Sequence, residues 1–180
     1  MKFKILLVLL LLLAMTAGAF LWWAFSPLLF NEEVQDELDP ELRARLEAQR
    51  QVDNRRVSND EDVETSDPVT EVDDSGVMTR GPFEVTGTPN HPAKGQVEII
   101  RSPEETLLHY MNYEGTNGPD LFVYLAKDLE ANEYIDLGEQ KGNRGNIIYG
   151  VPLDVDLSEY KYILTWCKAL GVLFDYAEIK

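Results

Sequence analysis

The stretch YKYILTWCKALGVLFDYAEIK, residues 160–180, decides the fold class. Within it, residues 160–167 and 172–177 are rich in β-branched and aromatic side chains, and turn-forming residues separate them, which is typical of strands. Alternation along the first strand places Trp166 and Cys167 on opposite faces. Both faces are apolar toward the strand centre, so we expect a central strand in which Cys167 is buried or lies in a cleft.

The same pattern continues upstream through residues 81–180. Short runs rich in Val, Ile, Tyr and Phe are separated by Gly, Asn and Pro, and none has a helical period over more than two turns. The further expected strands are residues 97–100, 107–112, 121–126, 135–137 and 147–151. We therefore predict that residues 81–180 form an all-β domain, a small antiparallel β-sandwich or barrel with a buried core.

Several short motifs follow one another in this domain. They are His91-x-x-x-Gly95-x-Val97, NGPDLFVYL at residues 117–125, Leu137-Gly138, Lys141-Gly142, Gly145, Tyr149-x-Val151-Pro152, Tyr160, Trp166-Cys167, Phe174 and Ala177. In this combination, residues 81–179 resemble the DM-thirteen domain family. The resemblance implies a β-rich extracytoplasmic domain with one characteristic cysteine and a role in electron transfer or redox reactions. Any redox partner, a membrane or extracytoplasmic redox protein, must then come from another chain.

Cys167 is the only cysteine of the chain, so an internal disulfide is excluded. A thiol can carry a redox event only if it can be reached and can ionise. Lys168 points away from it by alternation, whereas His91 could approach in the fold and activate a thiolate. One hypothesis is a redox or electron-transfer accessory centred on Cys167, with His91 as a second candidate. The alternative is a non-catalytic binding or structural module with Cys167 in the core, and an intermolecular disulfide also stays open.

Four further residues are candidates for a binding pocket: Trp166, Tyr124, Tyr149 and Asp120. Aromatic residues in such strands can line a pocket or relay electrons, but they also serve as ordinary core packing. Two histidines and one cysteine are too few for a metal centre of their own. Phosphate-loop, dinucleotide-binding and nucleophile-elbow motifs are absent from the sequence, so we predict no metal and no particular cofactor.

Residues 26–80 form an acidic spacer in this interpretation. Asp39 is suited to cap a helix and Pro40 to occupy its first position, so we expect a short, mostly exposed helix near residues 40–51. Residues 52–79 are rich in Asp, Glu, Ser, Asn and Thr without a periodic apolar face. This composition favours a largely disordered, extended tether.

Residues 5–25, ILLVLLLLLAMTAGAFLWWAF, carry no charge over 21 positions and are long enough to cross a bilayer. Lys2 and Lys4 precede the segment, which favours a cytoplasmic N-terminus and an extracellular or periplasmic C-terminal domain. Residues 1–25 are thus predicted to be a single-pass signal anchor that contacts membrane lipid through residues 5–25. Cleavage after Ala19, as in a secretory signal peptide, is the alternative.

The net charge of −16 is spread over both the spacer and the domain. Neither region contains the clustered Lys and Arg that phosphate neutralisation requires. The composition therefore excludes nucleic acid as a partner.

Overall fold

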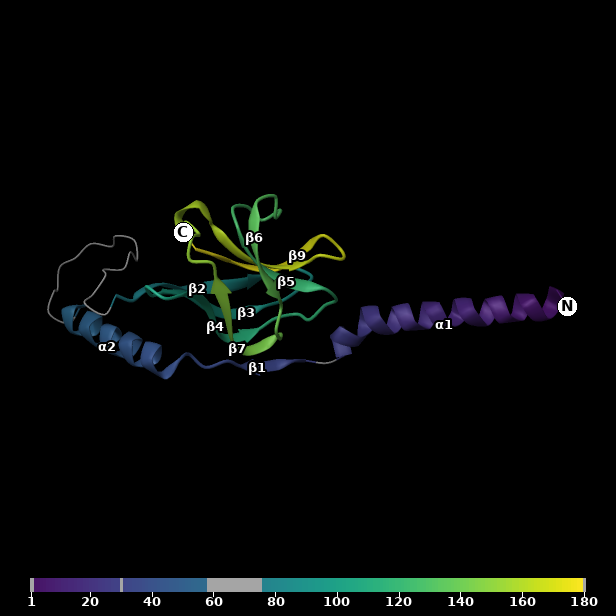
Figure 1. Ribbon diagram of the computed structural model, residues 1–180, viewed down its shortest axis with the longest axis horizontal. Helices are drawn as coiled ribbons and strands as arrows, with labels where there is room; N and C mark the ends of the chain where they lie inside the picture. Colours follow the sequence, from purple (N-terminus) through teal and green to yellow (C-terminus); the bar gives the residue numbers. More distant parts are fainter. Residues whose placement is uncertain (1, 30, 58–75, 180) are drawn as a thin grey trace.

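The computed structural model describes residues 2–29, 31–57 and 76–179 (Figure 1). A long helix, α1 (Lys2–Leu29), precedes the domain, and a second helix is α2 (Pro40–Val57). The strands are β1 (Glu33–Gln35), β2 (Met78–Gly87), β3 (Lys94–Arg101), β4 (Thr106–Glu114), β5 (Leu121–Ala126), β6 (Tyr134–Glu139), β7 (Arg144–Val151), β8 (Tyr162–Cys167) and β9 (Val172–Glu178). A 3-10 turn, Leu157–Glu159, precedes β8. The predicted β fold class is confirmed.

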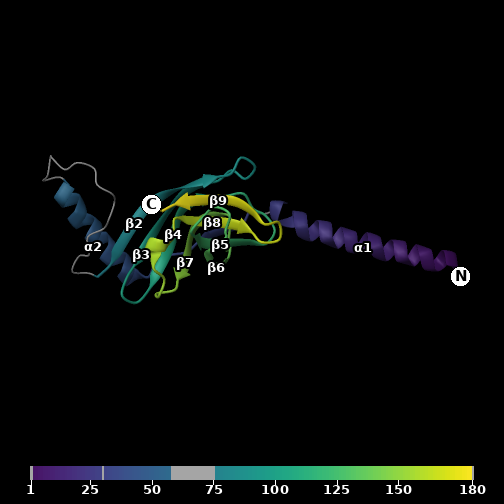
Figure 2. The ribbon, with the colours of Figure 1, turned by 90° about the horizontal axis from the view of Figure 1, so that it is seen from above.

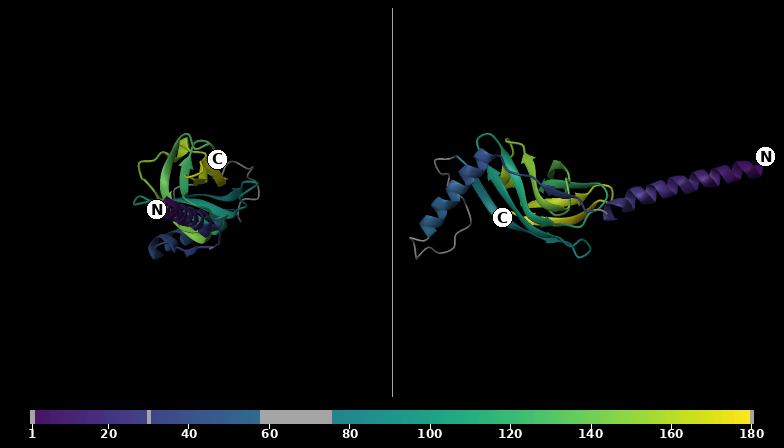
Figure 3. Two further views of the ribbon diagram at one scale, coloured as in Figure 1. Left: turned by 90° about the vertical axis from the view of Figure 1, so that its right-hand side faces the viewer. Right: turned by 90° about the horizontal axis from the view of Figure 1, so that it is seen from below.

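All nine strands belong to one curled sheet in the order β1-β7-β4-β3-β2-β9-β8-β5-β6. Every neighbouring pair is antiparallel except β1 and β7, which run parallel. The sheet curls until β6, at one edge, approaches β7, which lies next to the other edge. The result is a half-barrel, seen from three further directions in Figures 2 and 3.

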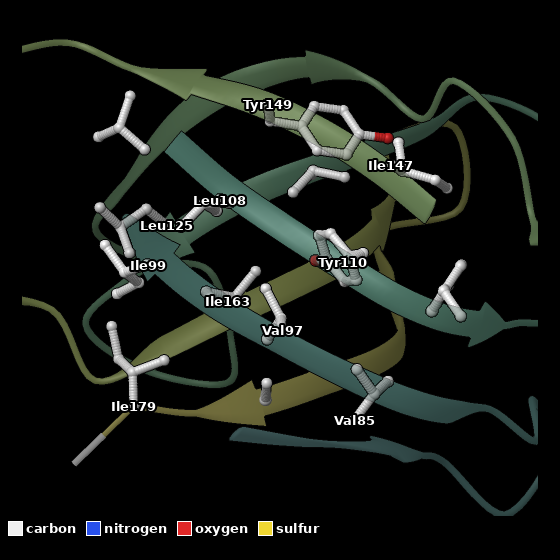
Figure 4. Close-up of a cluster of buried hydrophobic side chains, with 14 of the residues drawn as sticks. Val85, Val97, Ile99, Leu108, Tyr110, Leu125, Ile147, Tyr149, Ile163 and Ile179 are labelled. Atoms are coloured by element: carbon white, nitrogen blue, oxygen red, sulfur yellow. The ribbon is translucent and has the colours of Figure 1, made fainter. Parts of the chain in front are cut away.

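The inner face of the half-barrel is the main hydrophobic core (Figure 4). Cross-strand pairs on β3 and β4, such as Val97 with Tyr110 and Ile99 with Leu108, supply fully buried side chains from both partners. Ile163 of β8 faces them across the interior. Such pairs stabilise an antiparallel sheet through direct packing of their side chains.

A β-bulge in β4 lets two tyrosines face the core. The register against β7 shifts between Tyr110 and Tyr113, and Asn112 takes a positive φ of 50°. Asn tolerates this conformation better than most residues. The extra residue of the bulge reverses the alternation, so Tyr110 and Tyr113 are both buried on the inner side.

Each strand expected from the sequence has a counterpart in β3 to β9, and β8 is central between β5 and β9 as predicted. Two strands were not predicted. The residues of β2, MTRGPFEVTG, contain a Gly-Pro pair, and β1 has only three residues. Neither segment carries the apolar alternation by which the other strands are recognised.

The spacer differs from its prediction in residues 31–57. The helix begins at Pro40 as expected, with the Asp39 carboxylate accepting a hydrogen bond from the Glu41 backbone N–H at 2.9 Å, but it extends to Val57. Most of its positions up to residue 51 are exposed, as expected, but Leu42 and Leu46 are buried against Val77 and Ile100. Leucines at i and i+4 lie on one side of a helix and form a narrow apolar stripe. The residues on which this stripe packs are distant in the sequence, so the local composition does not predict the packing.

β1 also attaches the spacer to the domain. The backbone N–H groups of Asn143 and Arg144 donate to the Glu32 carbonyl at 3.0 and 3.2 Å. A side chain at position 145 would collide with the backbone of Val34, so a glycine is required where β1 pairs with β7. Residues 58–75, the larger part of the predicted tether, lie outside the described residues.

α1 contains one segment, Lys4–Trp23, that is long and apolar enough to cross a membrane. None of this segment is buried against the rest of the chain. This supports single-pass anchoring through the predicted segment, while the side of the membrane on which the domain lies stays a prediction.

Substituting Leu46 should weaken the docking of α2. Leu46 is 3% exposed, and Leu46→Ala should lower the free energy of unfolding by about 2 to 3 kcal/mol, because buried methyl groups are lost and a cavity is left. Urea denaturation measures this change. The exposed neighbour offers a control, since Glu47→Ala should shift the value by less than about 0.5 kcal/mol. Equal values for the two variants would mean that α2 is not part of the folded unit.

Candidate functional site

Three loops meet at the end of the domain from which α1 leaves (Figures 1 and 2). They are the β2–β3 turn with His91, the β4–β5 loop with residues 116–119, and the β8–β9 turn with Leu170. Together with Phe20 and Trp23 of α1 they line a pocket of about 670 Å³. Its volume and mainly apolar lining are those of a site for a small molecule or an inserted side chain of a partner.

Cys167 lies directly behind this pocket. The thiol is 0% exposed and packs with Leu121 and Phe174, and Phe174 itself lines the pocket. The Sγ atom lies 3.0 Å from the Pro119 carbonyl oxygen, to which the thiol donates a hydrogen bond. Phe174, which belongs to this buried cluster and also lines the pocket, lies on the pocket side of the cluster.

His91 comes to the same end of the domain but does not pair with Cys167. Its ring stacks on Phe174 with the ring centroids 3.8 Å apart and 13° between the planes. Nδ1 lies 3.0 Å from the Thr88 hydroxyl oxygen. Among the described residues no hydrogen bond joins His91 to the thiol; Phe174 stacks on His91 and belongs to the buried cluster of Cys167. Activation of Cys167 by His91 would therefore require Phe174 to move.

Gly118 makes this arrangement possible. A Cβ atom at position 118 would come within 2.7 Å of the Phe174 ring, closer than real side-chain contacts allow. The glycine of the Asn-Gly-Pro motif therefore lets the β4–β5 loop pass over the ring. Its presence leaves room for Phe174 to stack on His91 and to pack in the buried cluster of Cys167.

The other predicted pocket residues lie apart from one another. Asp120 is exposed at the edge of a smaller neighbouring pocket, with a positive φ of 58°. Trp166 and Tyr124 pack in a cluster on the outer face of β5, β8 and β9, where Tyr124 stacks on Tyr134. Tyr149 is in the main core. The structure thus brings Cys167 and His91 to one site, with Asp120 nearby.

Lys168 lies on the outer face, opposite Cys167, as alternation predicts. Its Nζ atom is 3.4 Å from the centre of the Phe122 ring and 2.7 Å from Asp136. The lysine therefore cannot stabilise the thiolate directly.

A buried polar cluster lies deeper in the half-barrel and was not identified from the sequence. The Asp175 carboxylate of β9 accepts hydrogen bonds from the Tyr113 hydroxyl and the Thr165 hydroxyl, both at 2.8 Å. Gln140 Nε2 donates to the Tyr113 hydroxyl oxygen at 3.1 Å. Burial raises the pKa of Asp175 to about 6, although both hydrogen bonds act to lower it. Burial, followed by the charge of Asp175, raises the pKa of Tyr113 well above its ordinary value.

One sequence signal could have identified this cluster. Asp175 is the cross-strand partner of Thr165 and stands two positions before the buried Ala177. Alternation therefore places a charged side chain on the inner face, which is an unusual position for a carboxylate. Tyr113 carries no such signal, because only the β4 bulge turns it inward.

A second polar cluster lies on the outer face of the sheet beside α2. Glu98 is buried and pairs with His109 Nδ1 at 3.1 Å and with Arg50 Nη2 at 2.7 Å. Burial acts to raise the pKa of Glu98, but the hydrogen bond from His109 and the charge of Arg50 outweigh it and hold the pKa below its ordinary value. This cluster ties α2 to β3 and β4, and it lies away from Cys167.

Comparison with known proteins identifies one family. The family model described as "Electron transfer DM13" matches residues 83–179, just over half of the chain. The match covers the strands from the second half of β2 to β9, and it includes His91, Gly118, Cys167 and Phe174. No curated protein and no solved structure matched the chain.

The buried carboxyl of Asp175 should make stability depend on pH in a defined direction. Its pKa is higher in the folded protein than in the unfolded chain, so the folded state gains relative stability as the pH falls through about 6 toward 4. From pH 7 to pH 4.5 this contribution should increase the free energy of unfolding by about 2 kcal/mol.

The measurement is urea denaturation of the wild type and Asp175→Asn across this pH range. Other carboxyl groups contribute equally to both proteins, so the difference between the two curves isolates Asp175. A difference that does not change with pH would show that the pKa of Asp175 is the same in the folded and unfolded states, so that burial does not raise it.

Proposed function

Because the chain belongs to the DM13 family of electron-transfer domains, we propose that it is a membrane-anchored electron-transfer accessory, with its domain outside the cytoplasm and Cys167 as its redox group. The observation that carries this proposal is the place of the thiol. It lies behind one aromatic ring, Phe174, at the base of the pocket that the family's motif residues line.

The anchor supports a partner at or near the membrane surface. Phe20 and Trp23, at the end of the apolar segment, form part of the pocket wall. Leu170, at the tip of the β8–β9 turn, is 64% exposed beside them. With α1 across a bilayer, these three apolar side chains would lie in its interfacial region, where Trp is favoured. The pocket would then face proteins or lipids of the same membrane.

The thiol would work by exchange with a disulfide of another chain. In this step the Cys167 thiolate attacks one sulfur of the partner disulfide, a mixed disulfide forms, and the other partner sulfur leaves as a thiolate. A second partner thiol then resolves the mixed disulfide and restores Cys167. Since the chain has a single cysteine, both steps depend on partner thiols. Displacement of Phe174 toward the pocket would open the path to Sγ and let His91 accept the thiol proton.

The second candidate is a non-catalytic binding module. It is favoured by the complete burial of Cys167, because a small apolar role in the core needs no access. In that case the pocket takes a ligand or a partner side chain, and Cys167 contributes to stability alone. The two candidates differ in whether the native thiol can be reached without global unfolding.

The reactivity of Cys167 tests the proposal. The full-length protein in detergent micelles is incubated with glutathione disulfide, and the mixed disulfide is measured by intact mass. If Phe174 opens locally, the adduct should form slowly in the wild type, and low urea concentrations should barely change the rate. Gly118→Val should form the adduct about tenfold faster, because the added side chain displaces the ring.

Two controls accompany this experiment. Gly150→Val should react like the wild type, since a Cβ atom at position 150 meets no neighbour within 4 Å. Cys167→Ser should form no adduct. A wild-type rate that rises with urea as steeply as global unfolding does would assign the thiol to the core and favour the binding module.

The proposed orientation is tested in intact cells that produce the chain. With Cys167→Ser as the background, Asp154→Cys places a thiol at an exposed position of the domain, and Lys2→Cys places one before the apolar segment. A membrane-impermeant maleimide should label Asp154→Cys before lysis and Lys2→Cys only after lysis. The reverse pattern would place the domain in the cytoplasm. The intact mass of the same samples reveals whether the chain is cleaved after Ala19.

A further inference from the structure

A carboxylate buried beside a tyrosine is the group that the thiol proposal does not use. Asp175 is 2% exposed, and within the described part of the chain no lysine, arginine or histidine forms an ion pair with it. Its two oxygen atoms instead accept hydrogen bonds from two neutral hydroxyl groups. A pair of apolar residues would fill the same space without desolvating a charge, so packing alone does not account for this residue.

We propose that Tyr113 is a redox-active tyrosine and that Asp175 is its proton acceptor. This inference rests on the proposed electron-transfer function and assigns a second group to it. A phenol that loses an electron must also lose its proton to give a stable neutral radical. The Tyr113 hydroxyl donates to Asp175 Oδ2 at 2.8 Å, within the reach of a positioned base.

The surroundings of Tyr113 connect it to the protein surface and to other aromatic rings. The Gln140 side chain donates a hydrogen bond to the Tyr113 hydroxyl oxygen. Gln140 also lines the smaller pocket that contains Asp120, at the end of the domain from which α1 leaves. A single side chain therefore separates the phenol from this pocket. On the other side, Tyr110 lies edge-on to Tyr113 with the centroids 5.3 Å apart, and Tyr149 lies 6.0 Å from Tyr110. Three tyrosine rings thus form one continuous row through the core.

The proposed step balances as follows. A one-electron oxidant, an oxidised metal centre of a partner protein, takes one electron from Tyr113. The oxidation state of that metal centre falls by one. The phenolic O–H bond breaks, and its proton forms a new O–H bond at Asp175 Oδ2. The products are a neutral tyrosyl radical and a neutral carboxylic acid, so no net charge is created inside the core. Return of one electron from a donor, with the same proton, restores both groups.

Thr165 has a positioning role in this arrangement. Its hydroxyl donates a hydrogen bond to Asp175 Oδ1 at 2.8 Å, which orients the carboxylate so that Oδ2 faces the phenol. Burial favours the neutral form of Asp175, and so it favours the protonated product of the step.

Photo-oxidation of the full-length chain in detergent micelles tests the inference. A flash in the presence of tris(bipyridine)ruthenium and persulfate generates a one-electron oxidant, and samples frozen at increasing delays are examined by electron paramagnetic resonance. The wild type should show a persistent tyrosyl radical, identified by the narrowing of its spectrum when ring-deuterated tyrosine is incorporated. Tyr113→Phe should lose this radical, and Asp175→Asn should form about tenfold less of it, because the base is absent.

Tyr134→Phe is the matched control, because Tyr134 is 44% exposed and should leave the persistent signal unchanged. Circular dichroism of each variant verifies folding, and Asp175→Asn keeps the test decisive if Tyr113→Phe does not fold. A persistent radical of equal yield in Tyr113→Phe or in Asp175→Asn would overturn the inference. Formation of the glutathione adduct on Cys167 is measured separately, so loss of one result leaves the other proposal standing.

Discussion

The half-barrel depends on one hydrogen-bonded carboxylate that joins its two sides. Tyr113 belongs to β4 and Asp175 to β9, which are separated in the sheet by β3 and β2, so their hydrogen bond crosses the concave interior. Thr165 of β8 completes the junction. Each of these groups is buried, and an unpaired partner would leave a polar atom without water or a hydrogen bond. The two sides of the curled sheet are therefore joined through the hydrogen bonds of a single buried side chain.

The sequence was sufficient for those parts of the fold in which each strand carries its own apolar pattern. The segments that became β3 to β9 have short apolar runs between turn residues, and the central place of β8 in the sheet, with Cys167 buried, followed from two apolar faces on one strand. The missed elements lack such a pattern. β2 contains Gly-Pro, and β1 pairs with β7 beside Gly145, far away in the chain. The helix α2 was predicted, but the packing of Leu42 and Leu46 on the sheet was not, because their partners are also distant in sequence.

Only part of the candidate site could be predicted from the sequence, since Trp166, Tyr124 and Tyr149 lie elsewhere in the domain. Cys167 and His91 do reach one end of the domain, yet the sequence cannot indicate that Phe174 stands between them. Tyr113 could not be assigned to the core, because strict alternation places it opposite Tyr110 and only the bulge at Asn112 reverses this. Asp175 was not singled out from the sequence, although its register beside Thr165 puts it inside.

The docking of residues 31–57 on the sheet limits how the domain can rotate above a bilayer. A tether of the same length without contacts would let the domain tumble and present any face to its surroundings. Here β1 leads directly from α1 onto the sheet edge, so only a few residues near position 30 separate the apolar helix from the folded unit (Figure 3). With α1 in a membrane, the end of the domain from which α1 leaves would stay close to the lipid surface. The effective concentration of the domain near other proteins of that membrane would then be high. Encounters with the proposed redox partner would then be a two-dimensional search, in which a reactive centre close to the membrane surface is the easiest to reach.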